Sequence, residues 1–109
     1  MDKHLRIFVL ALFVIGLHTD VALAQNFNTN IDGLVLKELR CTGSNYGANI
    51  VNRTNNSIEG RVVIKVFDKD GDPVGVCSKH VSLGPNSGNR FYAGGCNCRY
   101  AKRLSITVQ

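Results

Sequence analysis

The stretch RVVIKVF at residues 61–67, followed by DKDGDP at residues 68–73, decides the fold. In the first segment Val62, Ile64 and Val66 alternate with more polar positions, so one apolar row would face one side of a β-strand. In the second segment the Asp-Gly pair favours the positive φ of a tight turn, and the proline after it bars an inner ladder position. Together the two segments predict a β-hairpin.

Further short strands extend from this hairpin in both directions. The expected strands cover residues 34–41, 46–52, 61–67, 74–83, 90–98 and 103–109. Turn signals separate them, and a change of alternation near residues 77–79 indicates a bulge or two short strands. No window keeps a helical period. Six or seven short strands predict an all-β fold, a small antiparallel β-sandwich of immunoglobulin or fibronectin-III type with two disulfides.

The N-terminal residues have the three-part pattern of a secretory signal. Two cations precede an apolar run at residues 7–17, and an Ala-Leu-Ala sequence closes the segment. The run is too short to span a bilayer comfortably, although an uncleaved N-terminal anchor is the alternative. We expect residues 1–24 to be a cleaved signal peptide, 25–32 a flexible lead-in and 33–109 the β-sandwich domain. This organisation predicts a secreted or periplasmic protein with no membrane span after cleavage.

The four cysteines fit two disulfides in an exported chain. Cys96 and Cys98 stand one residue apart, which on a strand is the outer limit for a bridge between them. Chain entropy also favours longer loops, by about 3–4 kcal/mol against roughly 1.6 kcal/mol for a three-residue loop. We therefore expect Cys96 and Cys98 to bridge separately to Cys41 and Cys77, with both pairings open. The remaining connectivity, Cys41–Cys77 with Cys96–Cys98, would create a reducible pair suited to thiol–disulfide redox or chaperone-like activity.

Several turn motifs carry a family resemblance. An N-x-[ST] turn at residues 52–54 follows one strand, and a strand with an F-D-x-D-G hairpin follows at residues 62–71. A Leu-Gly-Pro turn at residues 83–85 then precedes a strand with the aromatic Phe91. In these features about half of the chain after residue 24 resembles FxLYD-type and related fibronectin-III-like extracytoplasmic β-sandwich domains. The resemblance implies an immunoglobulin-like sandwich that binds a partner, and it implies no catalytic residue. The C-x-C alone is similar to that of a small periplasmic curli-assembly chaperone.

The charge balance suggests the chemistry of a partner. The chain has 13 Lys and Arg and 8 Asp and Glu, a net charge of +5. Two residues of each sign lie in residues 1–24, so the rest of the chain keeps +5. A basic surface suits an anionic partner such as a polysaccharide, a lipid head group or a nucleic acid, and no nucleic-acid-binding motif is present. We expect a protein or an anionic polymer as the partner outside the cytoplasm. The candidate contacts for an anion or partner are Arg90, Arg99, Tyr100, Lys102 and Arg103; a solvated basic loop is the alternative.

Two adjacent sequons stand in a polar turn that we expect to be exposed. Asn52 and Asn55 each begin an N-x-[ST] pattern, so both would be glycosylation sites in a eukaryotic secretory pathway. A plain Asn-rich turn is the alternative.

Other chemistry has less support in the sequence. His80 is the only histidine after residue 24 and has no acid beside it, so we expect no enzyme activity outside cysteine redox chemistry. Asp68, Asp70 and Asp72 surround the turn glycine, but Lys79 stands where a calcium loop needs its twelfth-position Glu, so a plain hairpin is expected. The cysteines lack the C-x2-C spacing of zinc sites. We expect no metal and no cofactor.

Overall fold

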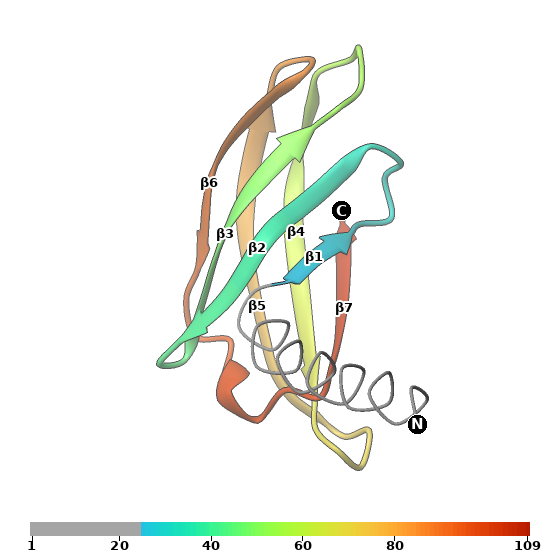
Figure 1. Cartoon of the computed structure of the whole chain (residues 1–109). Coiled ribbons are helices and arrows are strands. Elements are labelled where there is room, and N and C mark those ends of the chain that lie inside the picture. The colour runs from blue at the N-terminus through green and yellow to red at the C-terminus, as the bar shows by residue number, and fades with distance from the viewer. Residues whose placement is uncertain (1–24) are drawn as a thin grey trace, which may run out of the picture.

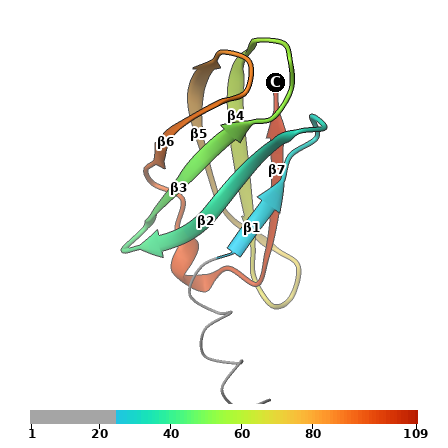
Figure 2. The same ribbon diagram turned by 45° about the horizontal axis from the view of Figure 1, so that its top comes forward.

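The computed structural model describes residues 25–109, so the expected signal peptide lies outside the described residues. The elements are β1 (Gln25–Asn28), β2 (Leu34–Thr42), β3 (Asn45–Asn52), β4 (Ile58–Phe67), β5 (Pro73–Leu83), β6 (Ser87–Ala93), the 3-10 turn η1 (Cys98–Tyr100) and β7 (Arg103–Val108). They form two antiparallel sheets, with strand orders β1-β2-β3-β6 and β5-β4-β7, that face each other (Figures 1 and 2). The predicted all-β sandwich with two disulfides is confirmed. Within residues 25–109 no helix is long and apolar enough to cross a membrane.

The core lies between the two sheets and follows the alternation in the sequence. Its largest apolar side chains with at most 2% exposure are Leu34, Leu36, Ile50, Val62, Ile64, Val66 and Phe91. Each such side chain stabilises the fold by about 1.5–3 kcal/mol relative to an exposed position. Strand β4 is central in its sheet, so its apolar row meets neighbours on both sides.

A bulge in β2 corrects the alternation of that strand. Strict alternation after Leu36 would turn Glu38 inward. Instead the register shifts between Lys37 and Arg40, and Glu38 adopts a φ of 56°. Leu39 then points into the core with 5% exposure. The Glu38 N–H donates to the Asn26 side-chain oxygen at 2.9 Å, so the displaced backbone group is satisfied.

The expected flexible lead-in at residues 25–32 is wrong for its first four residues. Gln25–Asn28 form β1, which pairs with β2, and Phe27 packs against the core. A single aromatic residue in a polar run gives little periodic signal in the sequence, yet burial of the Phe27 side chain is what places this segment in the sheet. The chain then turns through Thr29, whose hydroxyl donates to the Leu34 carbonyl at 2.9 Å.

The irregularity expected near residues 77–79 is also wrong. The pairing of β4 with β5 is continuous there, and the register shift lies between Val66 and Phe67. Lys79 pairs with the inward-facing Val62, yet its side chain is exposed. Because β5 is an edge strand, a long side chain at an inward position can still reach solvent.

The side where β1 and β7 approach each other is partly closed by one side chain. The Asn30 amide nitrogen donates to the Val108 carbonyl at 3.3 Å, and the Val108 N–H donates to the Asn30 side-chain oxygen at 2.7 Å. This pair of bonds occupies the outer backbone groups of β7 near its end. Such capping limits pairing of an edge strand with another chain.

Candidate functional site

Both disulfides connect the segment after β6 to a distant strand. Cys41 bridges to Cys98 with 5.9 Å between their Cα atoms, and Cys77 bridges to Cys96 with 4.8 Å. The expectation of two separate long-range bridges is confirmed, and the structure selects one of the two open pairings. No described cysteine is free. The Cys96–Cys98 bridge on which the redox alternative depends is therefore not formed.

The predicted strand at 90–98 ends at Ala93, because the chain leaves the sheet at Gly94. Gly95 has a φ of 74° and Asn97 a φ of 57°, so the backbone reverses twice. The two sulfurs point to different strands as a result. Because Cys96 and Cys98 do not lie on a continuous strand, the alternation that would put both sulfurs on one face does not apply.

This crossing loop is held tightly at the end of the sandwich. The Cys96 N–H donates to the Ser44 carbonyl at 2.7 Å, and the side-chain amide nitrogen of Asn97 donates to the Val74 carbonyl at 2.8 Å. Below the loop, a Cβ at Gly75 would collide with the Cys96 carbonyl oxygen. The loop is thus a rigid support for the basic segment that follows it.

Three of the candidate contact residues converge beside this loop. Arg99, Tyr100 and Lys102 line a concavity of about 390 Å³ against the β4–β5 hairpin, together with Asp68, Lys69 and Val74. The Arg99 guanidinium lies 6.0 Å from the centre of the Tyr100 ring. Tyr100 is 58% exposed, which is unusual for a large aromatic side chain. Lys69 also lines this concavity, and the sequence analysis missed it because it lies far from Arg99 along the chain.

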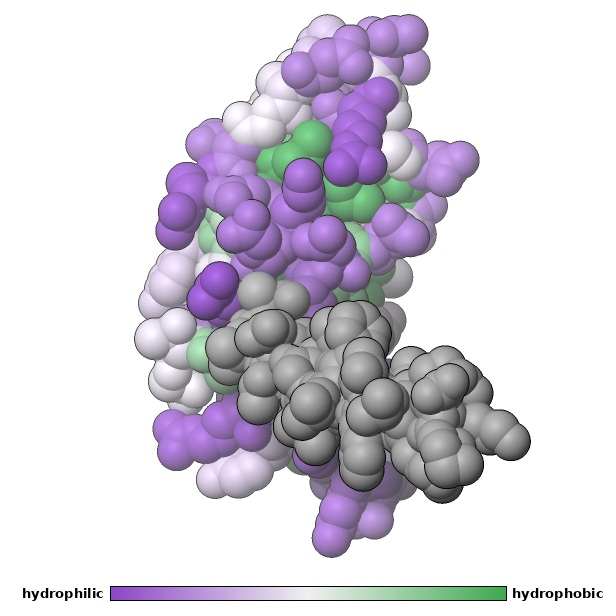
Figure 3. Space-filling model, in the orientation of Figure 1, coloured by the Kyte–Doolittle hydropathy of each residue, from purple (hydrophilic) through white to green (hydrophobic). Residues whose placement is uncertain are grey.

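The other two candidates lie elsewhere. The Arg103 guanidinium covers the Phe67 ring at 4.1 Å, a close cation–π contact. Arg90 pairs across β3 with Asn49 and lies on the outer face of the four-stranded sheet, beside Arg40 in a shallow depression of about 180 Å³. The expectation that Arg90 joins the Arg99–Arg103 segment is therefore wrong, because β6 carries it onto a different face. Hydrophilic side chains cover much of the side seen in Figure 3, with a small hydrophobic area toward its upper part.

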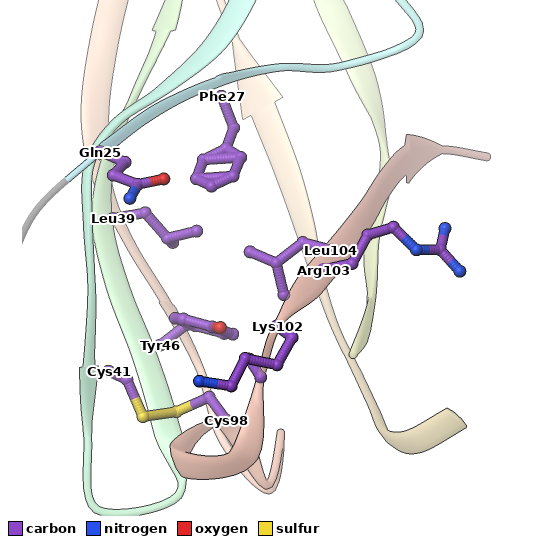
Figure 4. A pocket seen from close by; sticks show the side chains of 10 residues that line it. Gln25, Phe27, Leu39, Cys41, Tyr46, Cys98, Lys102, Arg103 and Leu104 are labelled. Carbon is purple, nitrogen blue, oxygen red and sulfur yellow. A yellow bond between two sulfur atoms is a disulfide. The ribbon is translucent and has the colours of Figure 1, made fainter. Parts of the chain in front are cut away.

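A second cavity, of about 470 Å³, opens between the two sheets on the β1–β7 side. Its lining residues are Gln25, Phe27, Leu39, Cys41, Tyr46, Cys98, Ala101, Lys102, Arg103 and Leu104 (Figure 4). The sequence analysis missed this cavity, since Leu39, Tyr46 and Leu104 look like ordinary core residues in a strand pattern. The bulge in β2 and the unexpected strand β1 bring these side chains together.

Tyr46 is the unusual residue of this cavity. Its side chain is 5% exposed, and no hydrogen bond joins its hydroxyl to another of residues 25–109. Since no fully buried side-chain oxygen in this part of the chain lacks a partner, the hydroxyl oxygen reaches the open space of the cavity. Burial raises the pKa of the Tyr46 hydroxyl above its ordinary value. The ring is buried while the hydroxyl faces the cavity, so the hydroxyl is available to water or to a ligand there.

The two sequons have different environments. Asn52 is fully buried, and its amide nitrogen donates to the carbonyls of Asn56 and Gly84, both at 2.8 Å. Its side-chain oxygen accepts from the N–H and the hydroxyl of Thr54. The expectation that both sequons lie exposed is therefore wrong for Asn52, whose hydrogen bonds hold the turn in place. Asn55 is exposed.

The acidic turn and the histidine have local roles. One Asp68 carboxylate oxygen accepts the N–H groups of Asp70 and Asp72, at 2.9 and 3.0 Å, which is the hydrogen bonding of a plain hairpin turn. His80 lies 3.4 Å from the exposed carboxylate of Glu59, on the outer face of the three-stranded sheet.

Comparisons with known proteins add no further constraint: the chain has no significant match among family models, curated proteins or solved structures.

Proposed function

We propose that this protein is a secreted or periplasmic binding module, without catalytic activity, that recognises an acidic polysaccharide. Two disulfides in a small all-β chain are compatible with a stabilised extracellular module. The resemblance to FxLYD-type domains, which we retain as a proposal, implies the same kind of role.

The observation that carries this proposal is the convergence of Lys69, Arg99 and Lys102 around one concavity. None of these cations has an acidic partner among residues 25–109, where the only ion pair joins His80 and Glu59. Asp68 is the single acid that lines the concavity, so the lining has three cations against one carboxylate. The concavity therefore presents a net positive charge to a partner.

The apolar surface of the same concavity favours a sugar over a simple anion. The exposed Tyr100 ring and the half-buried Val74 lie beside the cations. An aromatic ring offers a flat apolar face on which the C–H face of a sugar can pack. The guanidinium of Arg99 can bind a carboxylate through two parallel hydrogen bonds. A polymer of uronic acids presents both features in each unit.

The test is binding to polygalacturonate, with neutral dextran as the control polymer. The protein is exported from the full-length chain and purified, and mass spectrometry reads its N-terminus. We expect saturable binding to polygalacturonate that weakens steeply with added salt, and none to dextran. Replacing both Arg99 and Lys102 by Gln is expected to weaken binding about tenfold.

A matched control removes two other exposed cations, Arg53 and Lys79, which lie outside the concavity. The R53Q/K79Q variant has the same net charge as R99Q/K102Q. Equal weakening by both variants would show that net charge alone drives the binding, and the proposed site would be wrong. An N-terminus at Met1 in the purified protein would contradict signal cleavage.

A further inference from the structure

The cavity between the sheets has the size and lining of a small-molecule site. Its volume of about 470 Å³ falls in the range of roughly 300–1,000 Å³ that such sites occupy. Phe27, Leu39 and Leu104 supply an apolar wall that comes from three different strands. An aliphatic chain would find van der Waals contact on both sheets.

The polar groups of the cavity gather at one end. In Figure 4 Phe27 lies at one end, while Tyr46, Lys102 and the Cys41–Cys98 disulfide lie at the other. The Tyr46 hydroxyl points into the cavity and has no partner among residues 25–109. A ligand needs an acceptor for this hydroxyl, placed at the opposite end from Phe27.

The charges of the lining have one sign. No acidic side chain lines the cavity, whereas Lys102 and Arg103 do. Arg103 stacks on Phe67, which leaves Lys102 as the lining cation with neither an ion pair nor a cation–π contact among residues 25–109. A ligand head group with negative charge would be stabilised at this end.

Addition of a partner's β-strand fits this side of the molecule less well. Asn30 occupies the outward backbone groups of Val108 on β7. Main-chain pairing, which supplies the affinity of strand addition, could then use the β7 edge only at Leu104 and Ile106.

From these observations we propose that the cavity binds an aliphatic carboxylate, with its chain between Phe27 and Leu104 and its carboxylate at Tyr46 and Lys102. The Tyr46 hydroxyl and the Lys102 ammonium donate hydrogen bonds to the carboxylate oxygens. This site goes beyond the proposed polysaccharide function and shares only Lys102 with it.

The experiment is calorimetric titration of the exported, purified protein with decanoate below its micelle concentration. Decanol and decyltrimethylammonium test the head group. We expect decanoate to bind at one saturable site, decanol to bind at least tenfold more weakly, and the cationic amphiphile not to bind. Decanol binding as tight as decanoate, or the absence of a saturable site, would overturn the proposal.

Tyr46→Phe separates a ligand role from a structural role. Because the hydroxyl bonds to no other residue among 25–109, we expect the midpoint of urea unfolding to stay the same or rise. Decanoate binding is expected to weaken about fivefold, the effect of one lost hydrogen bond. Tyr92→Phe, on the outer face of the four-stranded sheet, is the control and should leave the affinity unchanged. Unchanged affinity in Tyr46→Phe would refute the contact.

One further variant distinguishes this site from the polysaccharide site. Arg99→Gln is expected to weaken polygalacturonate binding and to leave decanoate binding intact, while Tyr46→Phe should do the reverse. If only one of the two ligands binds, only the corresponding proposal survives.

Discussion

Among single residues, Asn52 has the most demanding environment. Its side chain is fully buried, and each hydrogen-bonding atom of its amide has a partner in the turn after β3 or the turn after β5. Replacement by Ala removes the bonds to the carbonyls of Asn56 and Gly84 and leaves the Thr54 N–H without its partner, while the two carbonyls keep the hydroxyls of Thr54 and Ser87. At about 1 kcal/mol for each of these three lost hydrogen bonds, we expect Asn52→Ala to lower the free energy of unfolding by about 3 kcal/mol. Urea unfolding measures this change.

The neighbouring sequon provides the control. Asn55 is exposed and exchanges one side-chain hydrogen bond with Asn86. Asn55→Ala should change stability by no more than about 0.5 kcal/mol. Similar losses in both variants would contradict the role assigned to Asn52.

Tyr46 makes stability sensitive to alkaline pH. Burial raises the pKa of its hydroxyl in the folded protein above that in the unfolded chain, which is about 10. The unfolded state therefore loses its proton first. The stabilisation is complete below pH about 10 and is lost as the pH rises toward the folded pKa. We expect the free energy of unfolding to decline across this interval, and Tyr46→Phe to remove that part of the decline.

Among the elements, the crossing loop over β5 depends on one glycine. Gly75 lies directly under the Cys96 carbonyl oxygen, so any Cβ there would displace the loop backbone or β5. We expect Gly75→Ala to lower the free energy of unfolding by about 2 kcal/mol or more, as overpacking against backbone does. Gly84→Ala, whose added Cβ would make only an ordinary van der Waals contact with the Ser87 hydroxyl at 3.8 Å, should be nearly neutral in the same chemical unfolding assay. Equal changes in the free energy of unfolding for the two variants would show that the crossing loop can shift at little energetic cost.

The bulge of β2 offers a second test at this scale. Glu38 adopts a left-handed conformation with a φ of 56°, which costs an L-residue roughly 1–2 kcal/mol and glycine almost nothing. We expect Glu38→Gly to be about 1 kcal/mol more stable than Glu38→Ala, with thermal unfolding as the measurement. Equal stability of the two variants would contradict a strained bulge.

Much of this arrangement could be predicted from local patterns. The alternation in β4 and the Asp-Gly turn after it predict the hairpin, and the RLSITV segment predicts β7. The first strand could not be predicted, because Phe27 is buried only through contacts with distant strands. The sequence also could not distinguish the two disulfide pairings, because the choice between them depends on the turn at Asn97. The cavity at Tyr46 depends on the β2 bulge and on β1, and neither has a clear signal in the sequence.

At the scale of the whole molecule, the two disulfides differ in solvent exposure as well as in loop length. Their sequence separations of 57 and 19 correspond to about 4 and about 3 kcal/mol of chain entropy. Cys41 is exposed, whereas Cys77 and Cys96 are 5% and 0% exposed. Because a thiolate must reach a sulfur to attack it, we expect rising reductant to open Cys41–Cys98 before Cys77–Cys96 in the folded protein.

Alkylation followed by mass spectrometry measures this order. Labels should appear first on Cys41 and Cys98. Simultaneous labelling of all four cysteines would indicate that reduction proceeds through global unfolding.

The Cys41–Cys98 bridge also determines how the molecule responds to mechanical load. A force applied at residues 25 and 109 passes through the sulfur–sulfur bond, so the enclosed strands β3 to β6 lie outside the tensioned path. At about 3.5 Å per residue, the segments 25–41 and 98–109 can extend to roughly 100 Å, against roughly 230 Å for a chain that keeps only the Cys77–Cys96 bridge. Held between two attachment points, the protein would act as a short tether with a limited reach.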